Sequence, residues 1–249
     1  PVSRNARRTS FSSIVYLSAG RCKKNLWYEM CRVSGFPPFP LRHTDIPADC
    51  MNSGICPAMP SVILAKDQPF DLDLSLSCGQ VFGWEREETA WRGIVGQKVI
   101  RIIQKGDRLS FSGADAGFIR HYFALDVDLP EILSSIDRDP VIHYAVSSCS
   151  GLRIIRQPPW ECLASFICAT YSNIPGIRKR VHLLCQNLGA PLSPEYPGLF
   201  SFPSPTAIAG AETCMLTGCR LGYRAGYLRE TARVLAADTE WEERIDALP

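Results

Sequence analysis

The chain has 249 residues, of which 46% are hydrophobic, and its formal net charge is +2. This length and hydrophobic content suit a globular protein with one large domain or two ordinary ones. A membrane-spanning helix needs roughly 18 consecutive apolar residues. The sequence contains no such run, so we expect no membrane partner.

Basic charge is concentrated in two blocks of the sequence. Residues 1–59 carry 8 Lys and Arg against 3 Asp and Glu, and residues 151–234 carry 9 against 4. Residues 60–150 are acidic, with 9 Lys and Arg against 13 Asp and Glu. A net charge of +5 over residues 151–234 attracts phosphate groups, although a solvated basic face without a partner fits as well. On charge alone, nucleic-acid binding is one of two open interpretations.

The 11 cysteines predict neither disulfides nor a metal site. They form no CxxC pair, and those after residue 60 lie mostly in apolar segments such as ECLASFICA, which is typical of reduced, buried thiols in an intracellular protein. Cys214 and Cys219 are a weak candidate pair of metal ligands, because no histidine lies near them. We therefore expect no metal and no organic cofactor.

The first block, residues 1–59, is rich in Arg, Ser and Pro and shows no sustained period of 2 or 3.6. An acid-poor, Arg-rich and Ser-rich start is similar to an organellar transit segment. A disordered or non-homologous tail is the favoured interpretation, because Met59 stands just before the first orderly segment.

An antiparallel sheet domain is predicted over residues 60–150. The alternating segments FDLDLSL, QVFGWERE, AWRGIVG, KVIRIIQ and RLSFSG, separated by polar turns, predict four or five strands. From about residue 115 the apolar spacing becomes helical, in ADAGFIRHYFALD, LPEILSSID and VIHYAVSSC.

Residues 151–249 alternate between helices and turns. Pro158 and Pro159 suit the start of a helix over WECLASFICATY, in which four residues share the face of an amphipathic helix: Leu163, Phe166, Ile167 and Thr170. Asn173 is a predicted N-cap for the helix that closes at Gly189.

Ser204 followed by Pro205 predicts another capped helix start, before TAIAGAETCML. YRAGYLRETARVLAA and TEWEERIDAL predict two more helices. A sheet domain followed by a helical domain makes this an α+β chain.

Two motifs suggest chemistry in this framework. Gly79, in SLSCGQVFGW, allows a positive φ or a close approach to bare backbone, although a bulge or strand end is the simpler interpretation. Arg178, Lys179 and Arg180 open a helix whose N–H groups could help hold a phosphate. An Asn cap with a solvated first turn is the alternative. Basic residues there oppose the helix dipole, which favours an anionic partner.

A third motif, LGYRAGY, places Tyr223 beside Arg224 on a glycine-punctuated turn where neither side chain can easily join a core. Packing under a loop, with Arg224 paired to Glu230 or another acid, is the simpler interpretation. A planar aromatic next to an arginine is also suited to entering a base stack and contacting an exposed base edge.

Four stretches in chain order resemble the 8-oxoguanine DNA glycosylase/AP lyase family: FDLDLSLSCGQVFGW, YFALDVDL, GLRIIRQPPWECLASFICATYSNIPGIRKRVHLLCQNLG and LGYRAGYLRETARVL. The resemblance runs from about Phe70 to Pro249. It implies an antiparallel sheet domain followed by an all-α helix-hairpin-helix glycosylase domain, of which residues 151–249 form a part.

The resemblance also implies a role for each matching residue. The carbonyl of Gly79 accepts the N7–H that distinguishes 8-oxoguanine from guanine. Tyr223 fills the gap left by the extruded nucleotide, and Arg224 contacts the opposite cytosine. Asn173 matches one residue of an asparagine run that members of the family carry, and Gly176 replaces a family arginine. Tyr171 could therefore stack at the opposite base instead, and the preference for cytosine could be looser.

The resemblance further implies a catalytic lysine, which forms a Schiff base at C1′, and an aspartate that assists it. Both positions lie beyond Pro249, so no catalytic residue is assigned in this chain, and we expect the chain alone to be inactive. The implied function is base-excision repair of 8-oxoguanine in duplex DNA by a monomer. We expect it in the cytoplasm or nucleoid of a prokaryote, or the nucleus or mitochondrion of a eukaryote.

A non-catalytic DNA-binding or damage-sensing module is the alternative from another class. A helical protein-interaction domain without a DNA role is a further rival. Salt-dependent binding to duplex DNA that weakens in Arg224→Ala would count against the latter.

Overall fold

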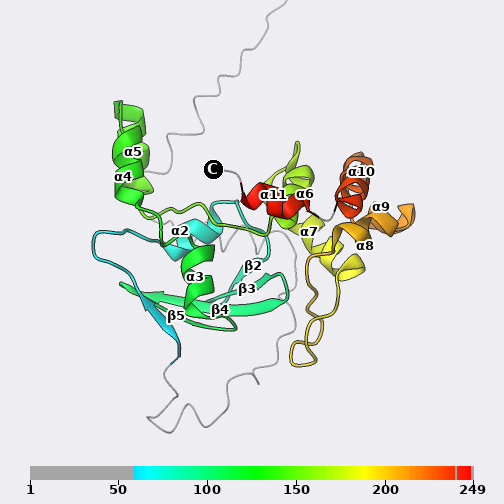
Figure 1. Ribbon diagram of the computed structural model, residues 1–249, viewed down its shortest axis with the longest axis horizontal. Helices are drawn as coiled ribbons and strands as arrows, with labels where there is room; N and C mark the ends of the chain where they lie inside the picture. The colour runs from blue at the N-terminus through cyan, green and yellow to red at the C-terminus, as the bar shows by residue number, and fades with distance from the viewer. Residues whose placement is uncertain (1–58, 239, 248–249) are drawn as a thin grey trace, which may run out of the picture. The chain divides into compact units, whose positions relative to one another are not determined.

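The structure is a computed structural model that describes residues 59–238 and 240–247 (Figure 1). These residues belong to one compact unit. The tail predicted over 1–59 lies outside the described residues except for Met59, and the boundaries of the predicted domains stay predictions.

The described residues contain one five-stranded sheet with neighbouring strands antiparallel in the order β1-β5-β4-β3-β2. Its strands are β1 (Ser61–Ile63), β2 (Trp84–Arg86), β3 (Trp91–Val95), β4 (Lys98–Lys105) and β5 (Arg108–Ser112). Gly96, with φ 59°, begins the two-residue turn from β3 to β4, where a positive φ matches the twist of a hairpin. Four of the predicted strand segments are confirmed, and β1 adds a strand that was not predicted.

The first predicted strand, FDLDLSL, is wrong: it forms helix α2 (Leu72–Ser77). The carboxylate of Asp71 caps this helix by accepting a hydrogen bond from the Leu74 N–H at 2.8 Å. Leu72 and Leu76, one turn apart, are both buried. The side chain of Gln104 on β4 accepts from the Leu72 N–H at 2.8 Å, so tertiary contacts override the alternating pattern.

The change from strands to helices near residue 115 is confirmed by α3 (Ala116–Tyr122), α4 (Leu129–Ile136) and α5 (Pro140–Ser148). Helices α2 and α3 contribute to a hydrophobic core with the sheet. In that core the Trp84 Nε1–H donates to the Tyr122 hydroxyl at 2.8 Å, so each of these two buried polar groups has a hydrogen-bond partner.

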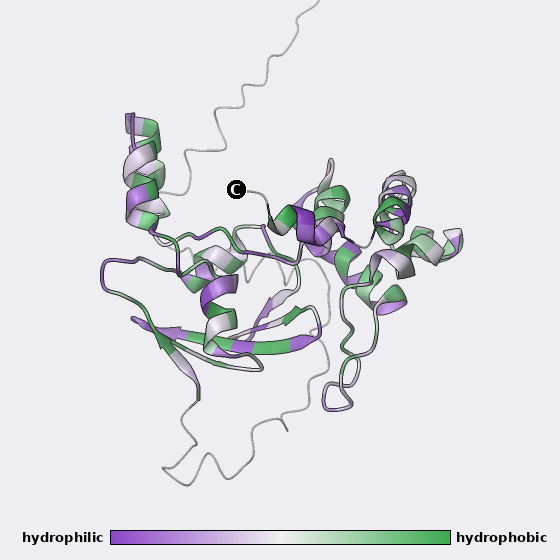
Figure 2. Ribbon diagram, viewed as in Figure 1, coloured by the Kyte–Doolittle hydropathy of each residue, from purple (hydrophilic) through white to green (hydrophobic). Residues whose placement is uncertain are grey.

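Helices α4 and α5 differ from α3 in their burial. Among the described residues, α5 contributes no buried side chain, and α4 contributes Leu129. Green hydrophobic segments are visible on both helices in Figure 2, and Val141 and Tyr144 are exposed. These two helices therefore add little to the core.

Arg153 ties together the segments that precede α2 and follow α3. Its side chain is 3% exposed. The guanidinium donates to the carbonyl oxygens of Ala124 at 2.6 Å and Val127 at 2.8 Å, and to Gln68 Oε1 at 3.1 Å. A buried arginine costs desolvation, which lowers the pKa of Arg153 below its usual value. Fixed oxygen acceptors compensate for that cost.

The remaining described helices lie between residues 159 and 246: α6 (Pro159–Ala169), α7 (Ile174–Leu188), α8 (Pro205–Gly210), α9 (Thr213–Gly218), α10 (Arg224–Ala237) and α11 (Trp241–Asp246). The predicted caps are confirmed, because Asn173 accepts from Gly176 at 2.9 Å and Ser204 from Ala207 at 3.1 Å. TAIAGAETCML forms two helices rather than one. Sheet and helices together confirm the α+β class.

The face shared by Leu163, Phe166, Ile167 and Thr170 on α6 is not the face buried most deeply. Trp160, Ala164 and Cys168, each four residues apart, are buried instead, and Phe166 is 73% exposed. Trp160 sets this orientation, because its Nε1–H donates to the Pro203 carbonyl at 2.8 Å while its rings lie in the second hydrophobic core.

The described cysteines are all free thiols, but they are not all buried, although the apolar segments around them suggested it. Cys168 and Cys219 are buried, whereas Cys78, Cys162 and Cys214 are exposed. Burial raises the pKa of Cys168 to about 12, so this thiol stays protonated and unreactive at neutral pH. Within the described part of the chain, no group of three or more His, Cys, Asp and Glu is arranged to hold a metal ion. The described helices also include none long and apolar enough to cross a membrane.

Candidate nucleic-acid interface

Arg224 joins the interior of the protein, contrary to the expectation that neither residue of the Tyr223–Arg224 pair would. It is 6% exposed at the start of α10. Its Nε donates to the Thr170 carbonyl at 2.8 Å, its Nη1 to the Leu221 carbonyl at 3.3 Å and its Nη2 to the Tyr171 carbonyl at 3.1 Å. Nη2 also contacts the Thr170 carbonyl. Because Thr170 caps the C-terminus of α6, a cation is favourable at this position.

Tyr223 remains on the surface beside Arg224. Its side chain is 58% exposed, and the Arg224 guanidinium carbon lies 4.5 Å from the centre of its ring, in a cation–π contact. Tyr227, one turn further along α10, is also exposed, and the two ring centroids are 6.2 Å apart at an interplanar angle of 80°. The start of α10 thus presents two aromatic rings to solvent, and the first of them, Tyr223, contacts a buried cation.

Tyr171 lies in the turn between α6 and α7 that Arg224 holds. Its side chain is 97% exposed and its φ is 51°, a left-handed conformation that is uncommon for residues other than glycine. Such a conformation costs about 1–3 kcal/mol and persists where surrounding contacts impose it. Here the bonds from Arg224 to the carbonyls of Thr170 and Tyr171 are those contacts.

The three basic residues at the start of α7 are not equivalent. Arg180 donates from Nε to the Arg220 carbonyl at 3.0 Å and from Nη1 to the Ser172 hydroxyl at 2.6 Å. Its guanidinium therefore secures the turn before α7 and the segment before α10. Arg178 and Lys179 are partly buried. The phosphate contacts expected of Arg178, Lys179 and Arg180 stay predictions.

Gly79 follows α2 rather than a strand, and its φ is 97°. This positive φ favours glycine, and a Cβ built there would lie 2.9 Å from Cδ1 of Ile174, the first residue of α7, whose side chain would have to shift. Gln80 fixes this loop by donating to the Arg153 carbonyl at 2.9 Å and accepting from the Ile155 N–H at 2.9 Å.

The structure therefore joins the predicted site residues in two groups. Gly79 lies against the residue that follows Asn173, and Tyr171 and Tyr223 both contact Arg224. Both groups adjoin the turn that connects α6 to α7.

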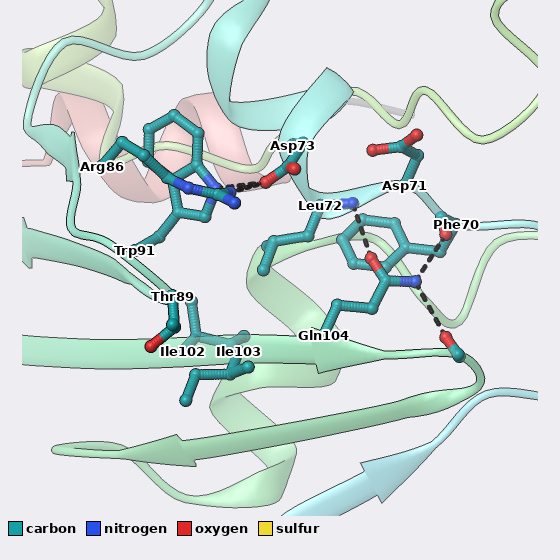
Figure 3. A pocket seen from close by; sticks show the side chains of 11 residues that line it. Phe70, Asp71, Leu72, Asp73, Arg86, Thr89, Trp91, Ile102, Ile103 and Gln104 are labelled. Atoms are coloured by element: carbon teal, nitrogen blue, oxygen red, sulfur yellow. Dashed lines mark hydrogen bonds and ion pairs between the residues drawn. The ribbon is translucent and has the colours of Figure 1, made fainter. Parts of the chain in front are cut away.

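The cavity drawn in Figure 3 lies elsewhere and contains none of these residues. Its volume is about 310 Å³, and it is formed by the start of α2, by β3 and β4 and by the turn before β3. The Trp91 Nε1–H donates to Asp73 at 2.7 Å, and the Gln104 amide nitrogen donates to the Phe70 carbonyl at 2.8 Å. Because its main polar groups bond to one another, we do not assign a function to this cavity.

Glu161, in the first turn of α6, is a titratable residue that the sequence did not single out. Its carboxylate faces Gly83, where a Cβ would lie 3.3 Å from Oε1. Burial raises the pKa of Glu161 from 4.5 to about 7. The folded protein therefore holds this proton more tightly than the unfolded chain does, and stability falls as the pH rises from about 4.5 through 7.

Glu161→Gln is expected to raise the free energy of unfolding by roughly 2–3 kcal/mol at pH 8 and to change it little at pH 4, because an uncharged amide has no ionised form to desolvate. Urea denaturation at both pH values measures this. Glu195→Gln, at an exposed position, is the control and should change stability little at either pH. An equal effect of Glu161→Gln at pH 4 and pH 8 would contradict the prediction.

Sequence reasoning also missed Tyr227 and Arg153. Tyr227 lies four residues after Tyr223, a spacing that puts both on one face of a helix and could have identified it. Arg153 carried no comparable signal, because its acceptors come from segments up to 85 residues away in the sequence.

Comparison with known proteins identifies related enzymes. Residues 62–163 match the family described as 8-oxoguanine DNA glycosylase, N-terminal domain. The chain is 36% identical over 119 residues to an N-glycosylase/DNA lyase of Saccharomyces cerevisiae. The aligned region covers 47% of this chain and 32% of the yeast protein. It spans about a third to a half of the length of the curated relatives it matches.

Solved structures extend the match. The 8-oxoguanine glycosylase/lyase of Clostridium acetobutylicum in its apo-form is 30% identical, with a TM-score of 0.67 over 76% of this chain and 68% of that one. The structure of its complex with double-stranded DNA containing cytosine opposite 8-oxoguanine gives a TM-score of 0.68 at 30% identity. The match covers 76% of this chain and 67% of the chain in the complex. Together with the matching fold, this similarity shows that the chain belongs to the 8-oxoguanine DNA glycosylase/lyase family.

Proposed function

We propose that this chain serves the removal of 8-oxoguanine from duplex DNA by binding the damaged duplex and stabilising it with the lesion extruded. The observation that carries this proposal is an exposed tyrosine at the start of α10, Tyr223, packed on the guanidinium of a buried arginine. A rigidly held, exposed ring is suited to replace a base in the stack. The names of the related enzymes support the same substrate.

Extrusion of a nucleotide costs a few kcal/mol of unstacking and unpairing. An aromatic ring inserted in the gap recovers part of this cost, because base–aromatic stacking contributes about 1–3 kcal/mol per base. We assign this wedge role to Tyr223. For Gly79 we propose the recognition of the N7–H of the lesion, supported by a positive φ that side-chain-bearing residues rarely adopt.

The chemistry proposed for the family is cleavage of the glycosidic bond with a Schiff base at C1′, followed by β-elimination. Among the described residues we assign no lysine to this attack. Lys66, Lys98 and Lys105 belong to the sheet region, and Lys179 lies within α7. The roles that we propose are insertion into the base stack for Tyr223 and recognition of the lesion for Gly79. We further propose that the protein acts as a monomer, in a compartment that contains DNA.

Tyr223→Ala tests this function. We expect it to weaken binding to a duplex with a tetrahydrofuran abasic-site analogue about tenfold, since one stacking ring is lost. Fluorescence anisotropy at fixed, stated salt measures the affinity. Tyr144→Ala is the matched control, because Tyr144 is 69% exposed on α5. The affinity of this variant for the abasic-site duplex should stay within about twofold of the affinity of the unmodified chain.

Equal affinity of the unmodified chain for the abasic-site duplex and for an undamaged duplex would contradict the proposed function. So would a Tyr223→Ala variant that binds the abasic-site duplex as tightly as the Tyr144→Ala control.

A further inference from the structure

We propose that Arg220, in the loop between α9 and α10, binds a backbone phosphate of the duplex beside the place where Tyr223 inserts. This inference rests on the proposed function and adds to it a phosphate contact outside the basic residues at the start of α7. Its consequence is that one exposed side chain accounts for about one phosphate's share of the salt dependence of DNA binding.

The backbone of Arg220 is the first step of the argument. Its φ is 57°, a left-handed conformation that residues with a side chain rarely adopt. Gly222, two residues later, has nearly the same φ of 59°. Glycine adopts this conformation at little cost, whereas an arginine there carries strain. The chain thus keeps an arginine where the backbone suits glycine, and strain of this kind is typical of functional sites.

The surroundings of Arg220 fix its backbone and leave its side chain in solvent. Cys219 and Leu221, on either side of it, are both 0% exposed, whereas Arg220 is exposed. The Arg220 N–H donates to the Thr217 carbonyl at 3.0 Å, and the Arg220 carbonyl accepts from Arg180 Nε at 3.0 Å. Because the main chain is held on both sides, a ligand has only the side chain to order.

The charge of Arg220 is not neutralised by the part of the chain that the structure describes. Its guanidinium forms no hydrogen bond or ion pair with another described residue. Arg180 and Arg224 differ, because both donate to backbone carbonyls. Arg233, on α10, pairs with Glu230 at 2.6 Å. An exposed guanidinium of this kind is suited to an oxyanion such as a DNA phosphate.

The distance of Arg220 from the proposed wedge is the last step. Tyr223 lies three residues further along the chain, so the two Cα atoms are within about 11 Å of each other. Each strand of a duplex carries a phosphate about every 3.4 Å along the axis. Insertion of the Tyr223 ring therefore brings several phosphates close to this loop. Arg180 also donates to the Ser172 hydroxyl at 2.6 Å, which ties the loop to the turn before α7.

Arg220→Gly tests the inference, because glycine keeps the left-handed backbone and removes the side chain. Fluorescence anisotropy measures the affinity of the 249-residue chain for an abasic-site duplex and an undamaged duplex between about 50 and 200 mM NaCl. Loss of one phosphate contact should reduce the slope of log K against log salt by about 0.9 in magnitude, which lowers the affinity about eightfold at about 0.1 M salt. Phosphate contacts carry no sequence information, so both duplexes should lose the same factor.

Two further variants separate the charge of Arg220 from its backbone. Arg220→Gln removes the charge and should reduce the slope as much as Arg220→Gly does, whereas Arg220→Lys keeps the charge and should retain the slope. The thermal midpoint of Arg220→Gly should equal or exceed that of the unmodified chain, because glycine relieves the strain. Should Arg220→Gly prove less stable, the slope of Arg220→Gln decides the question.

Arg120→Ala is the matched control. Arg120 is exposed on α3, and its guanidinium, like that of Arg220, forms no hydrogen bond or ion pair with other described residues. It belongs to the acidic stretch of residues 60–150. Removing this charge should leave the slope unchanged and the affinity for both duplexes within about twofold of that of the unmodified chain.

An unchanged slope in both Arg220→Gly and Arg220→Gln would overturn this inference and leave the proposed function standing. An equal reduction of the slope by Arg120→Ala would do the same. Equal affinity of the unmodified chain for the two duplexes would instead overturn the proposed function, whatever the slopes of the Arg220 variants. Tyr223→Ala separates the two roles, since it should lower the affinity for the abasic-site duplex without changing the slope.

Discussion

Replacing Arg153 by methionine should lower the free energy of unfolding by about 3–5 kcal/mol, because it leaves several buried oxygens without a donor. The guanidinium bonds to the carbonyls of Ala124 and Val127 and to the Gln68 side chain, and methionine can replace its volume but none of these bonds. Urea denaturation at 25 °C, followed by tryptophan fluorescence, measures the change.

Arg156→Met is the matched control for Arg153→Met, three residues along the same segment. Its guanidinium is partly exposed and pairs with Asp126 at 2.6 Å, which lowers the pKa of that carboxyl. An exposed pair contributes about 0–1 kcal/mol. Similar losses of stability in both variants would show that Arg153 is not the link between the segments around α2 and α3.

Trp160→Ala should also cost about 3–5 kcal/mol, since it empties a large site in the second hydrophobic core and leaves the Pro203 carbonyl without its donor. Thermal or urea denaturation of the purified variant measures the loss. A folded variant with near-normal stability would contradict the packing of α6 described above.

Phe166→Ala is the control on the same helix and should change the free energy of unfolding by less than about 1 kcal/mol, because the Phe166 ring is mostly in solvent. Comparing Trp160→Ala with Phe166→Ala tests whether the buried face of α6 is the one seen in the structure or the one that the sequence pattern predicted. If Phe166→Ala were the more damaging change, the predicted face would be the buried one.

Local signals in the sequence sufficed for much of the fold. The polar turns between the strand segments and the helix starts at Pro159, Asn173 and Pro205 depend on neighbours a few residues away, and the structure places them as expected. The segment Asp71–Ser77 was wrongly predicted to be a strand, because its alternating leucines fit a strand as well as a short helix. The contact of Gln104 with Leu72, 32 residues apart, decides between the two.

The sequence predicts which residues belong to the candidate site better than it predicts their geometry. Tyr223, Arg224, Asn173 and Gly79 could be identified from motifs and from the resemblance. The burial of Arg224 could not, because it depends on carbonyls of Thr170 and Tyr171 more than 50 residues earlier. The strained backbone of Tyr171 follows from those bonds, and a single sequence carries no sign of it.

The described sheet ends on two strands of three residues each, β1 and β2. A long, flat edge strand offers unpaired N–H and C=O groups to other chains and so promotes aggregation. Three residues offer few such groups, and on β2 the side chains of Glu85 and Arg86 add charges that resist a pairing strand. The sheet is thereby protected against edge-to-edge association between copies of the protein.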